Sequence, residues 1–115
     1  MAIKIIENPI KKAELTQIAS EQFGDFVKAV VDIDKKIMAI GGEMHADEEA
    51  LLITQGSKQE NVWGVNLYPE RHDEEFIEFN SMINLRPSQG NRSRGVESEE
   101  IRNQMRAVIK KLIIE

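Results

Sequence analysis

The chain has 115 residues and a formal net charge of -5 at pH 7, with 41% hydrophobic residues, 30% charged residues and no cysteine. This length and composition predict one soluble globular domain over residues 1–115, and they exclude a membrane span, which needs roughly 18 consecutive apolar residues. Without cysteine there is no disulfide, thiolate metal site or cysteine nucleophile, so we expect a cytoplasmic protein, and the acidic charge argues against nucleic acid as a partner.

The first half of the sequence predicts a strand, a helix and a hairpin. Residues 2–6 have the apolar pattern of a short strand, and Pro9 then favours the start of a helix that Gly24 would end. Apolar and polar residues alternate from 26 to 33 and return in a shorter run from 36 to 40, as in half-buried strands. Since only a short turn separates these two runs, we expect them to form an antiparallel hairpin.

The second half predicts two helices with a strand between them. A helix is expected from 43 to 56, and another from 99 to about 114 with Ser98 as its N-cap. Between them, residues 61–68 alternate as a strand, while 75–80 and 82–85 provide further extended chain. The predicted fold class is therefore α+β, a mainly antiparallel sheet of four to five strands with about three helices.

The segment RPSQGNRSRG, residues 86–95, collects three arginines and two glycines in an acidic chain. Guanidinium groups bind carboxylate and phosphate through paired donors, and glycine lets backbone N–H groups approach an anion, so we predict an anion site here. The alternative is a surface loop whose arginines pair with carboxylates elsewhere. The segment lacks the lysine and spacing of a P-loop. The candidate ligand-binding residues are Arg86, Ser88, Asn91, Arg92, Ser93 and Arg94.

Two similar acidic segments, HADEE at 45–49 and RHDEE at 71–75, contain both histidines of the chain. Histidine and carboxylates together are metal ligands, but neither segment matches the zinc-protease motif, so we assign no metal ligand, and the sequence leaves the cofactor unknown. Acids at a helix start are usually solvated. His45 and Glu49 share a helical face at a strand-to-helix junction, and they are the candidate catalytic acid and base.

Gly64 lies inside the predicted strand 61–68, next to Trp63. A glycine within a strand often marks the close approach of another backbone or of a ligand. Asn66, Tyr68 and Asn84 are therefore candidates for the lining of a polar pocket, whereas Trp63 is expected in the core.

Several long stretches resemble a known family. They are GGEMHADEEALL at 41–52, WGVNLYPE at 63–70 and INLRPSQGNRSRG at 83–95. Together with their flanking residues they are similar to a family of small prokaryotic proteins that is described only as a domain of unknown function. The resemblance extends over nearly the whole chain and implies a free-standing cytoplasmic domain. It implies no activity and no site residue.

Three functions from different classes follow from these features. The first is binding, or transformation, of an anionic or phosphorylated small molecule by the arginine segment, with His45 or a nearby carboxylate as acid or base; here Arg92 is expected to be essential. The alternative is a homodimeric interaction module in which the arginine segment docks on the acidic segments of a second copy. The third, RNA binding, is disfavoured by the acidic charge and the 5% aromatic content.

Overall fold

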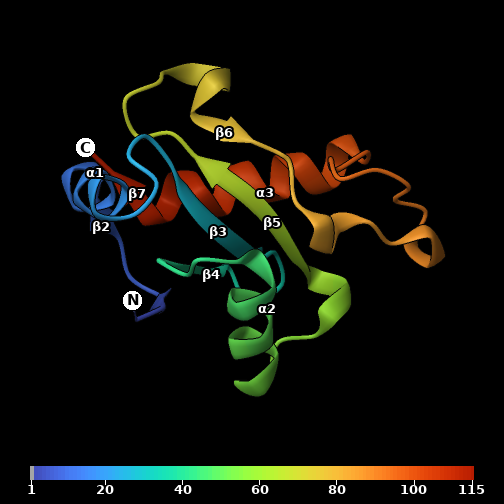
Figure 1. Ribbon diagram of the computed structural model, residues 1–115. Coiled ribbons are helices and arrows are strands. Elements are labelled where there is room, and N and C mark those ends of the chain that lie inside the picture. The colour runs from blue at the N-terminus through green and yellow to red at the C-terminus, as the bar shows by residue number, and fades with distance from the viewer. Residues whose placement is uncertain (1) are drawn as a thin grey trace.

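A five-stranded antiparallel sheet forms the centre of the fold, in the strand order β1-β4-β3-β5-β6 (Figure 1). The computed structural model describes residues 2–115. The strands of this sheet are β1 (Lys4–Ile6), β3 (Val27–Asp32), β4 (Ile37–Ile40), β5 (Val62–Leu67) and β6 (Ile77–Glu78). Two short strands, β2 (Ile10–Lys11) and β7 (Ile113–Ile114), form a separate parallel pair. The predicted hairpin is confirmed, because β3 and β4 are antiparallel neighbours.

Three α-helices and four 3₁₀ turns complete the described chain, which confirms the predicted α+β class. Gly24 and Gly56 have positive φ angles of 96° and 105°, as expected where a helix ends in the left-handed region. None of the helices within residues 2–115 has the length and apolar composition needed to cross a membrane. The helices are α1 (Lys12–Glu21), α2 (His45–Thr54) and α3 (Glu99–Leu112), and the turns are η1 (Gln59–Asn61), η2 (Asp73–Phe76), η3 (Met82–Asn84) and η4 (Pro87–Gln89).

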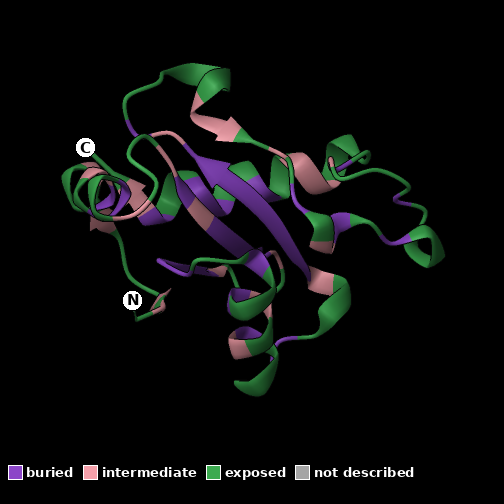
Figure 2. Cartoon of the chain, viewed as in Figure 1, coloured by how far each residue is buried: buried purple, intermediate pink, exposed green. Residues whose placement is uncertain are grey.

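The sheet is covered by helices on both faces. On one face, α1 and α3 pack on the inward residues of β3, β4 and β5, and this larger core contains Trp63, as predicted. On the other face, Leu52 of α2 packs on Val30, Ala39 and Val62, a smaller core that covers only part of the sheet. Figure 1 shows α3 behind β3 and β5 and α2 near their lower ends, and Figure 2 shows that both strands are largely buried. The rest of this second face is not covered by α2 and is available to other segments of the chain.

The segment after β6 differs from the prediction. Residues 82–85 were expected to be extended, but Met82–Asn84 is a 3₁₀ turn, capped by Ser81, whose Oγ accepts the N–H of Ile83 at 3.3 Å. Extended chain is likewise limited to Ile77–Glu78 within 75–80. Short polar residues favour such local hydrogen bonds over a sheet ladder, and alternation of side chains alone does not reveal this competition.

Candidate functional site

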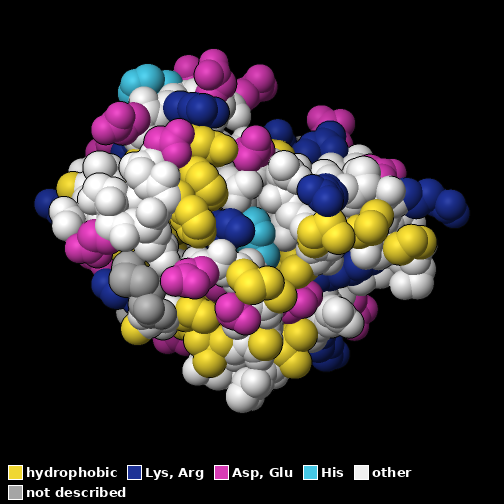
Figure 3. All heavy atoms as spheres, viewed as in Figure 1, with side chains coloured by type: hydrophobic (Ala, Val, Ile, Leu, Met, Phe, Trp, Pro, Cys, Tyr) yellow, Lys and Arg dark blue, Asp and Glu magenta, His cyan; other side chains and the backbone are white. Residues whose placement is uncertain are grey.

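A cavity of about 360 Å³ lies on the α2 face of the sheet, next to Gly64. It is enclosed by the first turn of α2, by β3 and β5, and by the segment around η3. A Cβ on Gly64 would lie 2.6 Å from Cβ of Ser81 and 3.2 Å from Cδ2 of His45, so only glycine lets both side chains approach the strand. Gly64 therefore does mark a close approach, but of two side chains rather than of the backbone or ligand that the sequence predicted. Figure 3 shows a histidine and a basic side chain near the centre of this face, framed by hydrophobic side chains.

His45 is the first residue of α2, and its ring reaches down to the sheet. Its Nε2 lies 2.7 Å from the carbonyl oxygen of Val65. Because a carbonyl only accepts, Nε2 carries the proton and Nδ1 keeps its lone pair. Burial lowers the pKa of His45 below its usual 6.5, Lys28 lowers it further, and the Val65 hydrogen bond opposes this shift. The cavity therefore contains a neutral imidazole in one fixed tautomer.

Lys28 and Arg94 place two positive charges at this cavity. Neither side chain takes part in an ion pair or a side-chain hydrogen bond within residues 2–115. The ammonium of Lys28 lies 5.2 Å from the centre of the Phe23 ring. The backbone of Arg94 is fixed, because its carbonyl oxygen accepts from Ser81 N and from Asn84 Nδ2, both at 3.0 Å. The two cations thus line the cavity, and none of the residues that line it is a carboxylate.

Asn66 and the start of α2 add hydrogen-bonding groups that the protein leaves unused. Asn66 is only 8% exposed, and its Nδ2 donates to Oε1 of Glu78 at 2.8 Å. Its Oδ1 is buried and has no hydrogen-bond partner in the described chain, a costly arrangement unless water or a ligand donates to it. The N-cap residue of α2, Met44, offers no side-chain acceptor to the free N–H groups of the first turn.

Glu48 is a buried carboxyl group that the sequence reasoning missed. It is fully buried, its Oε2 accepts the N–H of Gly42 at 2.8 Å, and Oε1 has no partner among the described residues. Burial raises its pKa to about 9, while the Gly42 hydrogen bond and Lys28 act in the opposite direction. Glu48 is therefore protonated at neutral pH. The available signal was its spacing of three and four residues from His45 and Leu52, which places all three on the inner face of α2.

Arg86 and Glu49, predicted as ligand-binding and catalytic residues, pair with each other. Nη2 of Arg86 lies 2.9 Å from Oε2 of Glu49 and 2.7 Å from the carbonyl oxygen of Val62. Nη1 donates to the carbonyl oxygen of Gln59 at 2.7 Å, and Arg86 is only 8% exposed. Both terminal nitrogens of the guanidinium are therefore engaged by internal contacts that fasten the arginine segment to α2 and β5, while Nε has no partner among the described residues. This pair lies outside the residues that line the cavity.

Asn91, another predicted ligand-binding residue, is buried, and its side chain fixes the conformation of the loop. Its Nδ2 donates to the carbonyl oxygens of Asn84, Ser93 and Gly95, and its Oδ1 accepts the N–H of Glu97 at 2.8 Å. Asn91 thus organises the loop. The remaining positions, Ser88, Arg92 and Ser93, are exposed and do not line the cavity. Of the eight predicted site residues, the structure brings together only His45 and Arg94 at one cavity.

The two histidines lie in different places. His72 is exposed beside η2 and lines a larger groove, whereas His45 lines the cavity. Within residues 2–115 no three histidine or carboxylate side chains cluster as metal ligands would. Tyr68 and Asn84 also do not line the cavity, although Asn66 does, as the sequence indicated.

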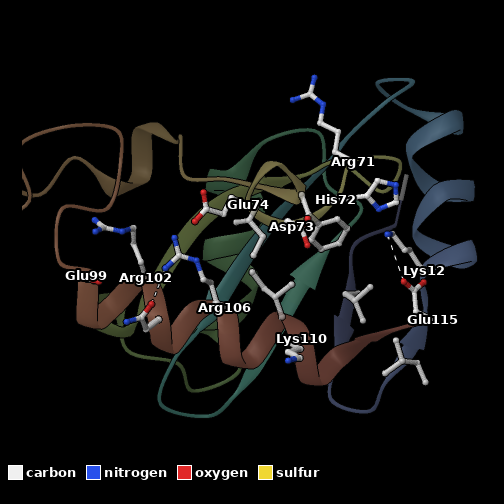
Figure 4. A pocket seen from close by; sticks show the side chains of 16 residues that line it. Lys12, Arg71, His72, Asp73, Glu74, Glu99, Arg102, Arg106, Lys110 and Glu115 are labelled. Carbon is white, nitrogen blue, oxygen red and sulfur yellow. Dashed lines mark hydrogen bonds and ion pairs between the residues drawn. The ribbon is translucent and has the colours of Figure 1, made fainter.

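The larger groove, about 980 Å³, runs between α3 and the η2 segment (Figure 4). Three of its basic side chains have hydrogen-bond or ion-pair partners, Arg71 and Lys110 have none within residues 2–115, and four carboxylate side chains line the same groove. Arg102 donates to the carbonyl oxygens of Val96 and Glu97, Arg106 donates to Oδ1 of Asn103, and Lys12 lies 4.0 Å from a carboxylate oxygen of Glu115. Figure 4 shows Arg71 directed away from α3. Because none of the buried unpartnered polar atoms of the described residues lies here, the smaller cavity is the better candidate site.

Comparison with known proteins places the chain among proteins without an assigned activity. Residues 4–112 match the family described as "Protein of unknown function (DUF5674)". The chain belongs to this family. This match over residues 4–112 confirms the predicted resemblance to a domain of unknown function, while the prokaryotic origin of the family stays a prediction. No similar curated protein and no similar solved structure was found.

Proposed function

We propose that this protein binds a small organic anion, a carboxylate or a phosphate ester, in the cavity beside Gly64. The observation that supports this function is the pair Lys28 and Arg94, two cations that line one cavity and make no ion pair or side-chain hydrogen bond within residues 2–115. They come from a strand and from a loop far along the chain, so the fold itself brings them to one cavity. A half-buried lysine has lost part of its hydration, and a bound anion stabilises its charge in place of the missing water.

Several further groups suit an anion with a polar substituent. The first turn of α2 carries the positive end of the helix dipole and lines the same cavity. Oδ1 of Asn66 is available to accept a hydrogen bond from a hydroxyl or amino group of the ligand. Each charge-assisted hydrogen bond contributes about 1.5–3 kcal/mol, so two or three of them support binding in the micromolar to millimolar range.

His45 adds a candidate catalytic base to the proposed site. Its Nδ1 is free to accept a proton, because Nε2 is held by Val65. If the bound anion is transformed, His45 is the base. Glu49, the other predicted catalytic residue, is engaged by Arg86 and has no part in this proposal.

A titration followed by two-dimensional ¹H–¹⁵N NMR tests the function. Acetate, phosphate, phenylacetate and phenyl phosphate are added separately to the full chain. The proposal expects at least one of them to shift the backbone amides of Ala46 and Ser81 and the side-chain amide of Asn66. If none of the four shifts these signals at millimolar concentration, or if the shifts are confined to Arg102 and Arg106 in the larger groove, the proposal is wrong.

The homodimer remains a separate prediction. One contact expected between copies, an arginine of the 86–95 segment on the HADEE segment, is already made within the chain by Arg86 and Glu49. Sedimentation at low and high salt decides whether the remaining charges join two copies, because an interface built on ion pairs weakens as salt rises.

A further inference from the structure

The rim of the cavity carries two methionine side chains that the described residues leave exposed. Met44 is 56% exposed and Met82 is 60% exposed, and both line the cavity although they come from different elements. Phe26 and Ile83 line it as well. Single exposed apolar residues are ordinary, but several around one concave site mark a binding surface. Figure 3 shows hydrophobic side chains gathered on this face.

The polar and apolar groups come from different walls of the cavity. Lys28 and Asn66 project from the sheet, and they are register partners on β3 and β5. Met44 directly precedes α2 and Met82 opens η3, so the two methionines come from the segments that cover the sheet. A ligand that bridges the sheet and its covering segments therefore needs a charged part and an apolar part.

We propose that the anion has an apolar body, an aromatic ring or a short hydrocarbon chain, seated against Met44 and Met82, while its carboxylate or phosphate reaches Lys28 and Arg94. This inference rests on the proposed function and adds the chemical class of the ligand. A sugar phosphate would place hydroxyl groups against methionine side chains, where they lose hydrogen bonds to water without replacement. Methionine is flexible and polarisable, and its sulfur makes favourable contacts with aromatic rings.

The size of the cavity agrees with this class. About 360 Å³ lies at the small end of the range found for ligand sites, roughly 300–1,000 Å³. A ring with a short acidic side chain fits such a volume, whereas a dinucleotide or a long acyl chain does not. The ligand is therefore expected to be a compact aromatic or aliphatic acid, or the corresponding phosphate ester.

The test uses pairs of anions that share a head group and differ in the apolar body. Dissociation constants are measured by calorimetry for acetate against phenylacetate and for phosphate against phenyl phosphate. The phenyl member of at least one pair is expected to bind about tenfold or more tightly, the gain typical of burying an aromatic ring. The two pairs also show which head group the cations prefer.

Variants of the two methionines test whether these side chains cause the higher affinity of the phenyl compound. M44S/M82S should weaken the phenyl compound about fivefold or more and leave the small anion of that pair within about twofold. I53S is the matched control, because Ile53 is also exposed on α2 but does not line the cavity. Both variants change exposed residues, and circular dichroism verifies that they fold.

The outcomes separate the two proposals. If an anion binds but in neither pair does the phenyl compound bind more tightly than the small anion, the inferred apolar body is wrong and the anion site stands. If none of the four binds, the proposed function fails as well. If sedimentation shows a dimer of the wild type that M44S/M82S abolishes, the methionines contact a second copy rather than a ligand, and this inference is overturned.

Discussion

The side-chain amide of Asn84 occupies the position of a neighbouring strand beside Gly64. Its Oδ1 accepts the N–H of Gly64 at 2.8 Å, and its Nδ2 donates to the carbonyl oxygen of Gly64 at 2.9 Å. The same Nδ2 donates to the carbonyl oxygen of Arg94 at 3.0 Å. One buried amide therefore joins the open edge of β5 to the η3 turn and the arginine segment. This connection places Ser81 and Arg94 at the cavity.

Replacing Gly64 by alanine should disrupt this junction. The new Cβ would lie 2.6 Å from Cβ of buried Ser81, which is close to the backbone and cannot turn away. We expect G64A to lower the free energy of unfolding by about 1–3 kcal/mol, as overpacking does. Urea unfolding measures this. G95A is the control, since its Cβ would meet other atoms only at 3.5 Å; equal stability of G64A and wild type would contradict the close contact.

The arginines of the 86–95 segment should differ sharply in their effect on stability. Arg86 is buried and bonded to Glu49 and two carbonyl oxygens, whereas Arg92 is exposed. Removing one partner of a buried ion pair costs about 3–5 kcal/mol, so R86M should unfold at a much lower urea concentration. R92M should stay within about 0.5 kcal/mol of wild type. Similar losses in both variants would show that Arg86 has no special structural role.

Glu48 should make folding weaker as the pH rises. Its pKa is raised from 4.5 to about 9 in the folded protein, so between these values folding requires uptake of a proton that the unfolded chain has released. The contribution of Glu48 to stability is complete below pH 4.5 and is lost at about 1.4 kcal/mol per pH unit up to about pH 9.

The variant E48Q isolates this effect. Glutamine keeps an oxygen for the N–H of Gly42 but does not titrate. Urea unfolding of both proteins from pH 5 to 8.5 should show a difference that grows with pH in favour of E48Q. Titration of all other groups cancels in that difference. Parallel curves would mean that Glu48 is ionised in the folded state.

His45 should remain neutral at pH 7 with its proton on Nε2. Burial is the main cause of its lowered pKa, and the hydrogen bond to Val65 selects the tautomer. ¹⁵N NMR of the imidazole nitrogens reports both properties. We expect a titration midpoint below 6.5, and a protonated Nδ1 at pH 7 would contradict the assignment.

The sequence predicted the elements with strong periodicity and the residues with special backbone geometry. The hairpin, the strand 61–68 and the capped helix after Ser98 are confirmed, because each depends on local pattern. The 3₁₀ turns between 73 and 89 were not predicted. At η3, for example, Ser81 caps the turn locally and Asn84 bonds to the distant backbone of Gly64, and the alternation of side chains reveals neither contact.

For the site, local composition was a poor guide. Three arginines in one segment looked alike, yet Arg86 faces Glu49 and Arg94 faces the cavity. Lys28 lies in a strand where its neighbours are core residues, and no local pattern marks it as part of a site. Its role depends on the pairing of β3 with β5, which places it opposite Asn66. This pairing is a feature of the tertiary structure, which the local sequence pattern does not show.

The measurement that tests the central claim most directly compares R94M with R92M. Both variants remove one arginine from the same exposed loop and change the net charge equally, but only Arg94 lines the cavity. Dissociation constants for the tightest of the four anions are measured by calorimetry. The anion site predicts a loss of about tenfold or more in R94M and less than about twofold in R92M. Equal affinities of the two variants would place the anion elsewhere.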